Sequence, residues 1–161
     1  MLNIQVVGDR ELIARFDAMP SKIRSALLRK VTALALMLEA KVKDEKLSGQ
    51  VLNVRSGALR RSIFNEVTDT ATEVTGKVAS SGDIKYASVH EYGGTINIPE
   101  ITAKGKALAF MMGGKQVFFK KVAAHTVTMP ERSFMRSSLK DMESQIREGL
   151  TQTVREAARQ K

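Results

Sequence analysis

The middle of the chain holds the stretch that decides the fold, YASVHEYGG at residues 86–94. Tyr86, Val89 and Tyr92 recur every third residue, which is typical of a short helix that packs by one side. The closing pair of glycines supplies the positive-φ freedom that ends such a helix. We therefore predict a short helix followed by a sharp exit into a strand. The simpler interpretation is a helix that closes one end of a sheet; the alternative is that it also holds two β-segments in register for an assembly surface.

Helical periodicity dominates the chain before this stretch. Residues 2–6 alternate apolar and polar and predict an edge strand, and Asp9 is a good N-cap for a short helix that Met19-Pro20 interrupts. From residue 20 or 21 to about Lys46, apolar residues recur at steps of three and four, which predicts a long helix with one buried side. That series is Ile23, Leu27, Val31, Leu34, Leu38 and Val42.

Strand patterns surround and follow the central stretch. Two runs rich in β-branched residues, 63–68 and 73–79, predict a hairpin. Residues 95–98 alternate up to a proline and predict an edge strand, followed by a polar loop at 100–105. The clearest hairpin joins residues 106–112 to 115–122 through Gly113-Gly114, a strong short-turn signal. One more brief strand is predicted at 126–129.

A last helix is predicted to begin at about Pro130, where the missing N–H of proline costs nothing. Its buried side is marked by Phe134, Leu139, Met142, Ile146, Leu150, Val154 and Ala157. These elements predict an α+β fold: a mostly antiparallel sheet with a long helix from the N-terminal half and a C-terminal helix packed on it, plus a protruding β-hairpin. The length suits a single domain over residues 1–161.

Composition narrows the class of protein. Hydrophobic residues make up 43% and charged residues 27%, so we expect a folded chain. No apolar run approaches the roughly 20 residues of a membrane helix, and the N-terminus lacks the layout of a secretory signal, so we expect no membrane partner and a chain soluble in the cytoplasm at synthesis. The absence of cysteine excludes disulfides and thiolate metal sites.

The net charge of +9 and the pI near 10.0 favour a polyanionic neighbour. There is no run of five like charges, no tryptophan and only 5% aromatic residues, so we expect any contact with DNA to run through phosphate charge rather than base reading. The candidate DNA-facing residues are Lys104, Lys106, Lys115, Lys120 and Lys121.

Catalysis would have to start from His90, Glu91 and His125, because imidazole is the commonest general base near neutral pH. No recognisable hydrolase, zinc-protease or phosphate-loop motif completes such a site. We therefore expect no enzyme activity, no cofactor and no metal, although a metal site that adds Asp83 to these three residues is the alternative.

Two further segments are candidates for docking. Ser56 can cap a single helical turn beside Arg55, Arg60 and Arg61, which either meet solvent or present planar donors to a partner's carboxylates or phosphate.

In the hairpin of residues 106–122, Phe118 and Phe119 point to opposite faces of a strand, so both cannot enter one core. We expect one of them in the core of its own domain and the other against a neighbouring subunit. The alternative is that the chain's own domain covers both faces.

Three segments together carry a family resemblance: RSGALRRSI at 55–63, YASVHEYGG at 86–94 and MPERSFM at 129–135. Their order and spacing resemble the tail-completion proteins of long-tailed bacteriophages, in which the pattern is SGxLRxSI, then YAxxxEfGG, then PaRpFlrpal. Ser133 departs from that pattern, which usually has a proline there.

The resemblance implies a non-catalytic structural virion protein of the neck, assembled in the host bacterial cytoplasm, which forms a sixfold ring with itself around the DNA path and joins tail to head. Its other partners would be neck and tail proteins: the tail terminator, the tail tube, and head-closure or connector proteins. The alternatives are a tail terminator ring that caps the tube and, from another class, a basic DNA-binding protein. The interface residues we expect are Arg55, Arg60, Arg61, Tyr86, Tyr92, Phe118, Phe119, Arg132 and Phe134.

Overall fold

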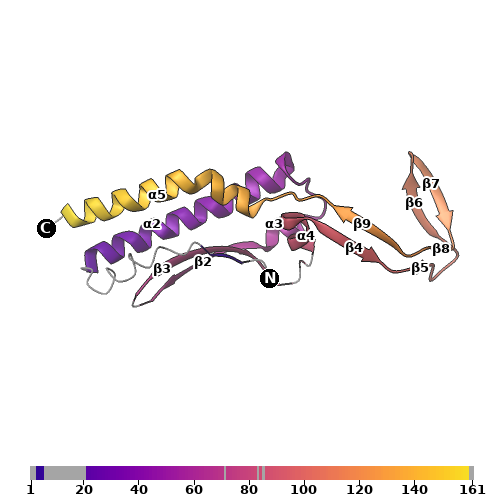
Figure 1. Ribbon diagram of the computed structural model, residues 1–161, viewed down its shortest axis with the longest axis horizontal. Helices are drawn as coiled ribbons and strands as arrows, with labels where there is room; N and C mark the ends of the chain where they lie inside the picture. Colours follow the sequence, from indigo (N-terminus) through magenta and orange to yellow (C-terminus); the bar gives the residue numbers. More distant parts are fainter. Residues whose placement is uncertain (1–2, 6–20, 71, 83, 85, 160–161) are drawn as a thin grey trace.

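The computed structural model describes residues 3–5, 21–70, 72–82, 84 and 86–159. These residues form an α+β fold, as predicted, with an elongated body from which a long β-ribbon extends (Figure 1). The helix predicted from Asp9 lies outside the described residues. No helix in the described part of the chain is both long and apolar enough to cross a membrane.

Two long helices form one layer of the body. Helix α2 (Ser21–Ala40) continues into a π-type helical stretch, η1 (Lys41–Gln50), and α5 (Met135–Arg159) lies antiparallel beside α2 (Figure 1). Regular helical geometry is lost at Ser48 and Gly49, where the glycine adopts a φ of 120°. This agrees with the long helix predicted to run to about Lys46.

A small antiparallel sheet forms the other layer. In the described residues its strand order is β1 (Asn3–Gln5), β3 (Val74–Ser80), β2 (Ile63–Asp69), which confirms the predicted first strand and hairpin. Helix α2 packs on β3 at Gly76, where an added Cβ would lie 2.9 Å from Cγ1 of Val31. The glycine therefore lets the helix approach the sheet closely.

The tightest core lies at the end of the body from which the ribbon leaves. There η1, the sheet, the short helices α3 (Ala58–Ser62) and α4 (Tyr86–Tyr92) and the start of α5 come together. Its buried members are Val42, Leu47, Leu52, Ile63, Val78, Ala87, Phe134 and Met135. Full burial of an aromatic ring such as that of Phe134 contributes about 3–5 kcal/mol as judged by truncation.

The predicted central helix exists as α4, but it packs by a different side from the one expected. Ala87 and Glu91 are buried, whereas Tyr86 and Tyr92 are 43% and 49% exposed. Residues four apart lie on one helix face, and here that face carries a small residue and a carboxylate. The prediction that the tyrosine side packs is therefore wrong, because the amphipathic tyrosine rings are placed where one edge stays in water.

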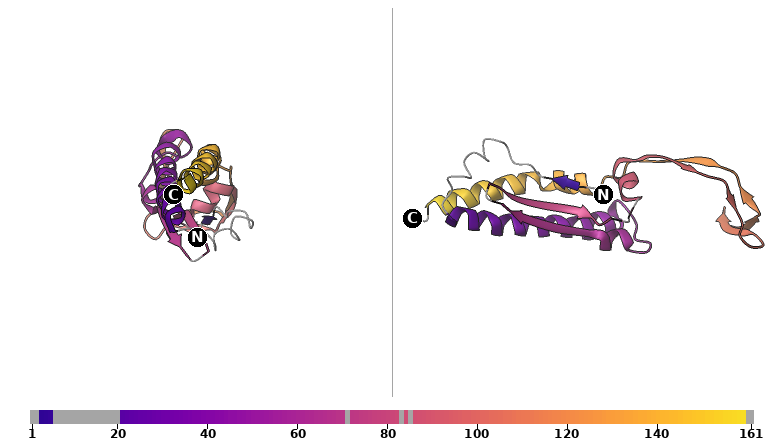
Figure 2. Two further views of the ribbon diagram at one scale, coloured as in Figure 1. Left: turned by 90° about the vertical axis from the view of Figure 1, so that its left-hand side faces the viewer. Right: turned by 90° about the horizontal axis from the view of Figure 1, so that it is seen from below.

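The ribbon, which we call the arm, spans residues 94–129 and consists of three successive antiparallel pairs. Strand β4 (Gly94–Ile98) pairs with β9 (His125–Met129), β5 (Ile101–Thr102) with β8 (Lys121–Val122), and β6 (Leu108–Met112) with β7 (Lys115–Phe119). The protruding hairpin is confirmed, and the arm bends on its way to the end formed by β6 and β7, which we call the tip (Figure 2). Residues 100–105 are not only a loop, because they contain β5.

Candidate functional site: the arm and its root

The tip has two apolar faces. Strand register places Leu108 opposite Phe119 and Phe110 opposite Val117, so these four side chains share one face. Phe118 lies on the other face, opposite Ala109 and next to Met111. The rings of Phe110 and Phe119 stack with their centroids 5.4 Å apart, which stiffens the first face. Gly113 and Gly114 both have positive φ, 57° and 78°, as the tight turn at the end of the hairpin requires.

Neither face of the tip is covered by the body. Met111 is 68% exposed, Met112 58%, Phe118 64% and Phe119 43%. The expectation that one of the two phenylalanines enters the core of its own domain is therefore wrong, and so is the alternative that the domain covers both. The arm is simply too far from the body for either ring to reach the core (Figure 1).

Lysines surround the tip. All five lysines predicted to face DNA are exposed, and they lie before β6, at the tight turn and after β7. Lys121 forms an ion pair with Glu100 at 2.8 Å; among the described residues no carboxylate lies within ion-pair distance of the other four, Lys104, Lys106, Lys115 and Lys120. The arm carries five lysines against one glutamate, so its apolar surface has a positive rim.

The arm joins the body at a cluster that we call the root, residues 90–93 and 131–136. At its centre lies Glu91, which is 0% exposed. One carboxylate oxygen, Oε2, accepts the backbone N–H groups of Phe134 and Met135 at 2.7 and 2.9 Å. The other, Oε1, accepts the Ser133 hydroxyl at 2.8 Å and both the backbone N–H and Nε of Arg136 at 2.9 and 3.2 Å. Glu91 therefore satisfies the free donors at the start of α5 from a different part of the chain.

This contact also explains where the last helix begins. The first turn of α5 starts at Met135, not at Pro130 as predicted, because the Glu91 carboxylate caps the chain there. Residues 130–134 remain outside the helix and lead from β9 to the cap.

Further contacts tie the two strands of the arm to the root. The N–H of Arg132 donates to the carbonyl of His90 at 2.8 Å, and Arg136 Nη2 donates to the carbonyl of Glu91 at 2.9 Å and to Glu131 Oε1 at 2.8 Å. The Arg136 guanidinium also lies 4.4 Å from the centre of the Tyr92 ring.

Gly93 is the closest approach between the two sides of the root. Its φ is 69°, and an added Cβ would lie 2.8 Å from the Glu131 nitrogen and 3.1 Å from the Met129 oxygen. Gly93, the first of the two glycines predicted to end the central helix, therefore also lets the two chain segments of the root lie in contact, whereas Gly94 has open space around it.

The residues considered for catalysis do not form a site together. His90 lies in α4, while His125 lies exposed in β9 of the arm with Nδ1 3.0 Å from the Ala123 carbonyl. The Glu91 carboxylate is fully used by its five donors. Asp83 lies outside the described residues, and within the described ones no three acidic or histidine side chains come close enough to hold a metal ion.

His90 is nevertheless unusual. In the described part of the chain its Nδ1 is buried without a hydrogen-bond partner, and its ring meets Tyr86 edge-on with centroids 5.8 Å apart. Burial, together with the positive charge of Arg132, lowers the pKa of His90 from its usual value.

The predicted docking arginines are in part engaged within the chain. Arg60 pairs with Asp44 at 2.6 Å, and Arg61 donates to the carbonyl of Ser56 at 3.1 Å. The Ser56 hydroxyl accepts a long 3.3 Å bond from the N–H of Ala58, and the N-cap position of α3 is held by Gly57, not by Ser56 as predicted. These arginines lie on the body, apart from the tip.

The remaining predicted interface residues differ in exposure. Tyr86 is exposed at the start of α4, and Tyr92 and Arg132 are exposed at the root. Phe134 is 0% exposed, so its assignment to an interface is wrong: the ring fills the core, as its place in the helical pattern suggested.

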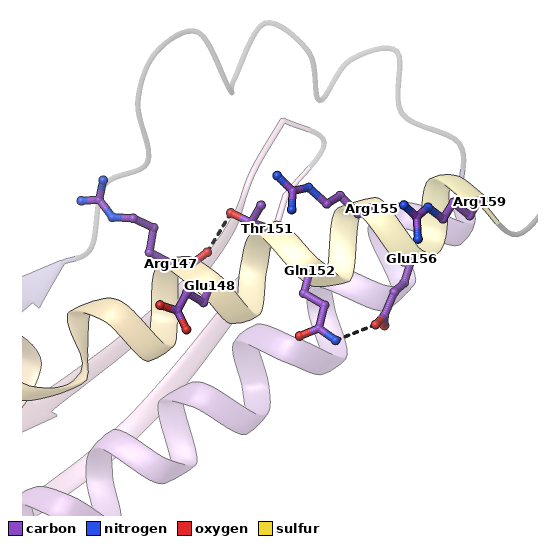
Figure 3. A pocket seen from close by; sticks show the side chains of 7 residues that line it. All are labelled: Arg147, Glu148, Thr151, Gln152, Arg155, Glu156 and Arg159. Atoms are coloured by element: carbon purple, nitrogen blue, oxygen red, sulfur yellow. Dashed lines mark hydrogen bonds between the residues drawn. The ribbon is translucent and has the colours of Figure 1, made fainter.

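A shallow hollow lies along the C-terminal half of α5 (Figure 3). Its lining residues are Arg147, Glu148, Thr151, Gln152, Arg155, Glu156 and Arg159. Gln152 donates to Glu156 at 2.7 Å, and the charges of both signs alternate along one helix. Such a mixed set does not converge on a ligand, so the arm remains the stronger candidate surface.

Comparisons with known proteins gave no relative: no protein-family model, no curated protein and no solved structure matches this chain.

Proposed function

We propose that this chain is a non-catalytic structural protein of a tailed bacteriophage, a tail-completion component that assembles with copies of itself into a ring at the head-proximal end of the tail and joins tail to head. The observation that carries the proposal is the arm, with an apolar tip that its own body does not cover. A two-stranded ribbon exposed on both faces is only marginally stable in water, so it needs a partner surface.

The size of the apolar surface favours a protein partner. From their exposed fractions, Met111, Met112, Phe118 and Phe119 together offer on the order of 450 Å². This area is divided between the two opposite faces of the tip and is not one contiguous patch, but so much exposed apolar surface on one short segment is typical of a protein contact site.

The shape of the molecule favours a ring of identical copies. The arm leaves the body at one end and carries its tip away from it (Figure 2). In the proposed assembly the tip of one copy binds the body of the next. Contacts of this head-to-tail kind generate closed rings when the rotation between copies closes. The sequence resemblance supports the same conclusion, because two of its three segments, 86–94 and 129–135, form the root of the arm.

The test is the assembly state of the purified protein without nucleic acid. Size-exclusion chromatography with light scattering and negative-stain images at neutral pH should give discrete rings. A monomer that binds DNA with a steep salt dependence, and forms rings under no condition, would instead support the basic DNA-binding alternative.

The tail terminator alternative also predicts a ring, so the two roles are separated by measuring which phage tails the purified ring binds. If the chain is the terminator, the ring should bind directly to the open end of a tail tube. If it is the tail-completion component, as we propose, the ring should bind tails that already carry their terminator and leave open tubes unbound.

A further inference from the structure

We infer that Glu91 is the positioning residue that fixes the direction of the arm relative to the body, and thereby the angle between successive copies in an assembly. The second half of this inference rests on the proposed function; the first half is a property of the single chain.

The arm has few connections to the body. In the described part of the chain, only the strands β4 and β9 join it to the body, and the pair Gly94–Met129 closes the ribbon at that point. A two-stranded ribbon has no third strand or covering helix to hold its direction, so its angle depends on what holds the two strands where they enter the body.

Both entry points meet at Glu91. The residue lies in the last turn of α4, after which β4 departs at Gly94, and its carboxylate binds the first turn of α5, into which β9 leads. Helix α5 in turn lies along α2 over much of the length of the body (Figure 1). The carboxylate therefore connects the start of the arm to the longest rigid element of the body, through five hydrogen bonds of 2.7–3.2 Å.

Burial makes this connection specific. An ionised carboxylate without exposure is stable only where its donors are correctly placed, so α5 and α4 have one favourable relative position. Exposed contacts in the root, such as Glu131 with Arg136, do not impose this condition because water can replace them.

A fixed direction has a consequence for assembly. A head-to-tail contact closes into a ring of one size only if every copy repeats the same rotation. An arm without a fixed direction would instead give open or mixed oligomers. Each contact between copies would also have to offset the entropy that the arm loses when it becomes ordered.

The absence of cysteine makes the direct measurement clean. Spin labels are placed on cysteines introduced at Ser144, exposed on α5, and at Ala124, exposed at the far end of the β4–β9 pair. The labelled protein is diluted with an excess of unlabelled protein, so that pulsed electron–electron double resonance reports only the distance between the two labels within one chain.

We expect a narrow distance distribution in the parent and a distribution at least twofold wider in Glu91→Gln. Glu131→Gln is the matched control, since it removes a carboxylate from the same cluster that is 55% exposed, and its distribution should equal that of the parent. A broad distribution in the parent, or a Glu91→Gln distribution as narrow as the parent's, would overturn the inference.

Should Glu91→Gln fail to fold, Glu91→Asp takes its place, because it keeps the charge but withdraws the carboxylate by one methylene; an unchanged width in that variant would overturn the inference as well. The second readout is assembly, where Glu91→Gln should give a spread of masses in place of one. If the parent forms no ring, the proposed function fails, while the distance measurement still decides the role of Glu91.

Discussion

Replacing Glu91 with glutamine is the sharpest stability test that the structure offers, because the side chain keeps its size and loses only charge and one acceptor. Each carboxylate oxygen receives at least two N–H donors: Phe134 and Met135 on Oε2, and the backbone and Nε of Arg136 on Oε1. Whichever way the amide of the glutamine is turned, its NH₂ group therefore faces two N–H groups from which it cannot accept a hydrogen bond.

The size of the effect follows from these contacts. Two buried donors left without an acceptor cost about 1–3 kcal/mol each. Loss of the negative charge at the start of α5 adds up to about 2 kcal/mol, since the carboxylate is buried against the helix end. Together these contributions span about 2–8 kcal/mol, and we expect a fall near the middle of that range, about 3–5 kcal/mol in the free energy of unfolding and roughly 10 °C in the melting temperature. The protein should still fold, because domains of this size have about 5–15 kcal/mol.

The assay is urea unfolding followed by circular dichroism at 222 nm, at a concentration where light scattering shows a monomer. Glu131→Gln is the control and should lose less than about 1 kcal/mol, since its ion pair is exposed. A loss below about 1 kcal/mol in Glu91→Gln would refute the reasoning, because it would mean that the five donors are satisfied without the carboxylate.

Three further predictions concern the root and the core. Gly93→Ala should lower the free energy of unfolding by about 2–4 kcal/mol, because the residue has a positive φ and the new Cβ would lie only 2.8 Å from the Glu131 nitrogen. Gly113→Ala is the control: its Cβ has open space around it, so the loss should be only the cost of a positive φ. Phe134→Ala should cost about 3–5 kcal/mol in the same urea assay, and no loss would show that the ring is not in the core. The pKa of His90 is lowered in the folded protein, so the unfolded chain binds more protons than the folded one below about pH 6.5, and the parent should lose stability as the pH falls from 7 towards 5. The free energy of unfolding of His90→Phe, measured over the same pH range, should lack that part of the loss. Identical pH profiles for the two proteins would contradict this prediction.

The local elements of this fold could be read from the sequence, because their signals are local. The steps of three and four from Ile23 to Val42 predicted the long helix, and the glycine pair at 113–114 predicted the tight hairpin that forms the tip. Even the opposite directions of Phe118 and Phe119 followed from strand geometry alone.

What could not be predicted depends on contacts between distant segments. Glu91 lies 43 residues before Phe134, and no spacing rule connects an acidic residue in one helix to the first turn of another. The start of α5 was misplaced for the same reason, since three N–H groups at its start are accepted by Glu91, and only that of Ser137 is accepted by a nearby side chain, Ser133. Exposure of both tip phenylalanines was missed because the pattern of a strand gives its two faces but not what covers them.

The most direct test of the proposed assembly through the arm is the mass of Phe118→Asp compared with the parent by light scattering. Phe118 is 64% exposed on the tip and touches no part of the core, so the variant should keep the circular dichroism spectrum and melting temperature of a folded body. We expect discrete rings for the parent and a folded monomer for Phe118→Asp. Rings of the same mass from both proteins would contradict it.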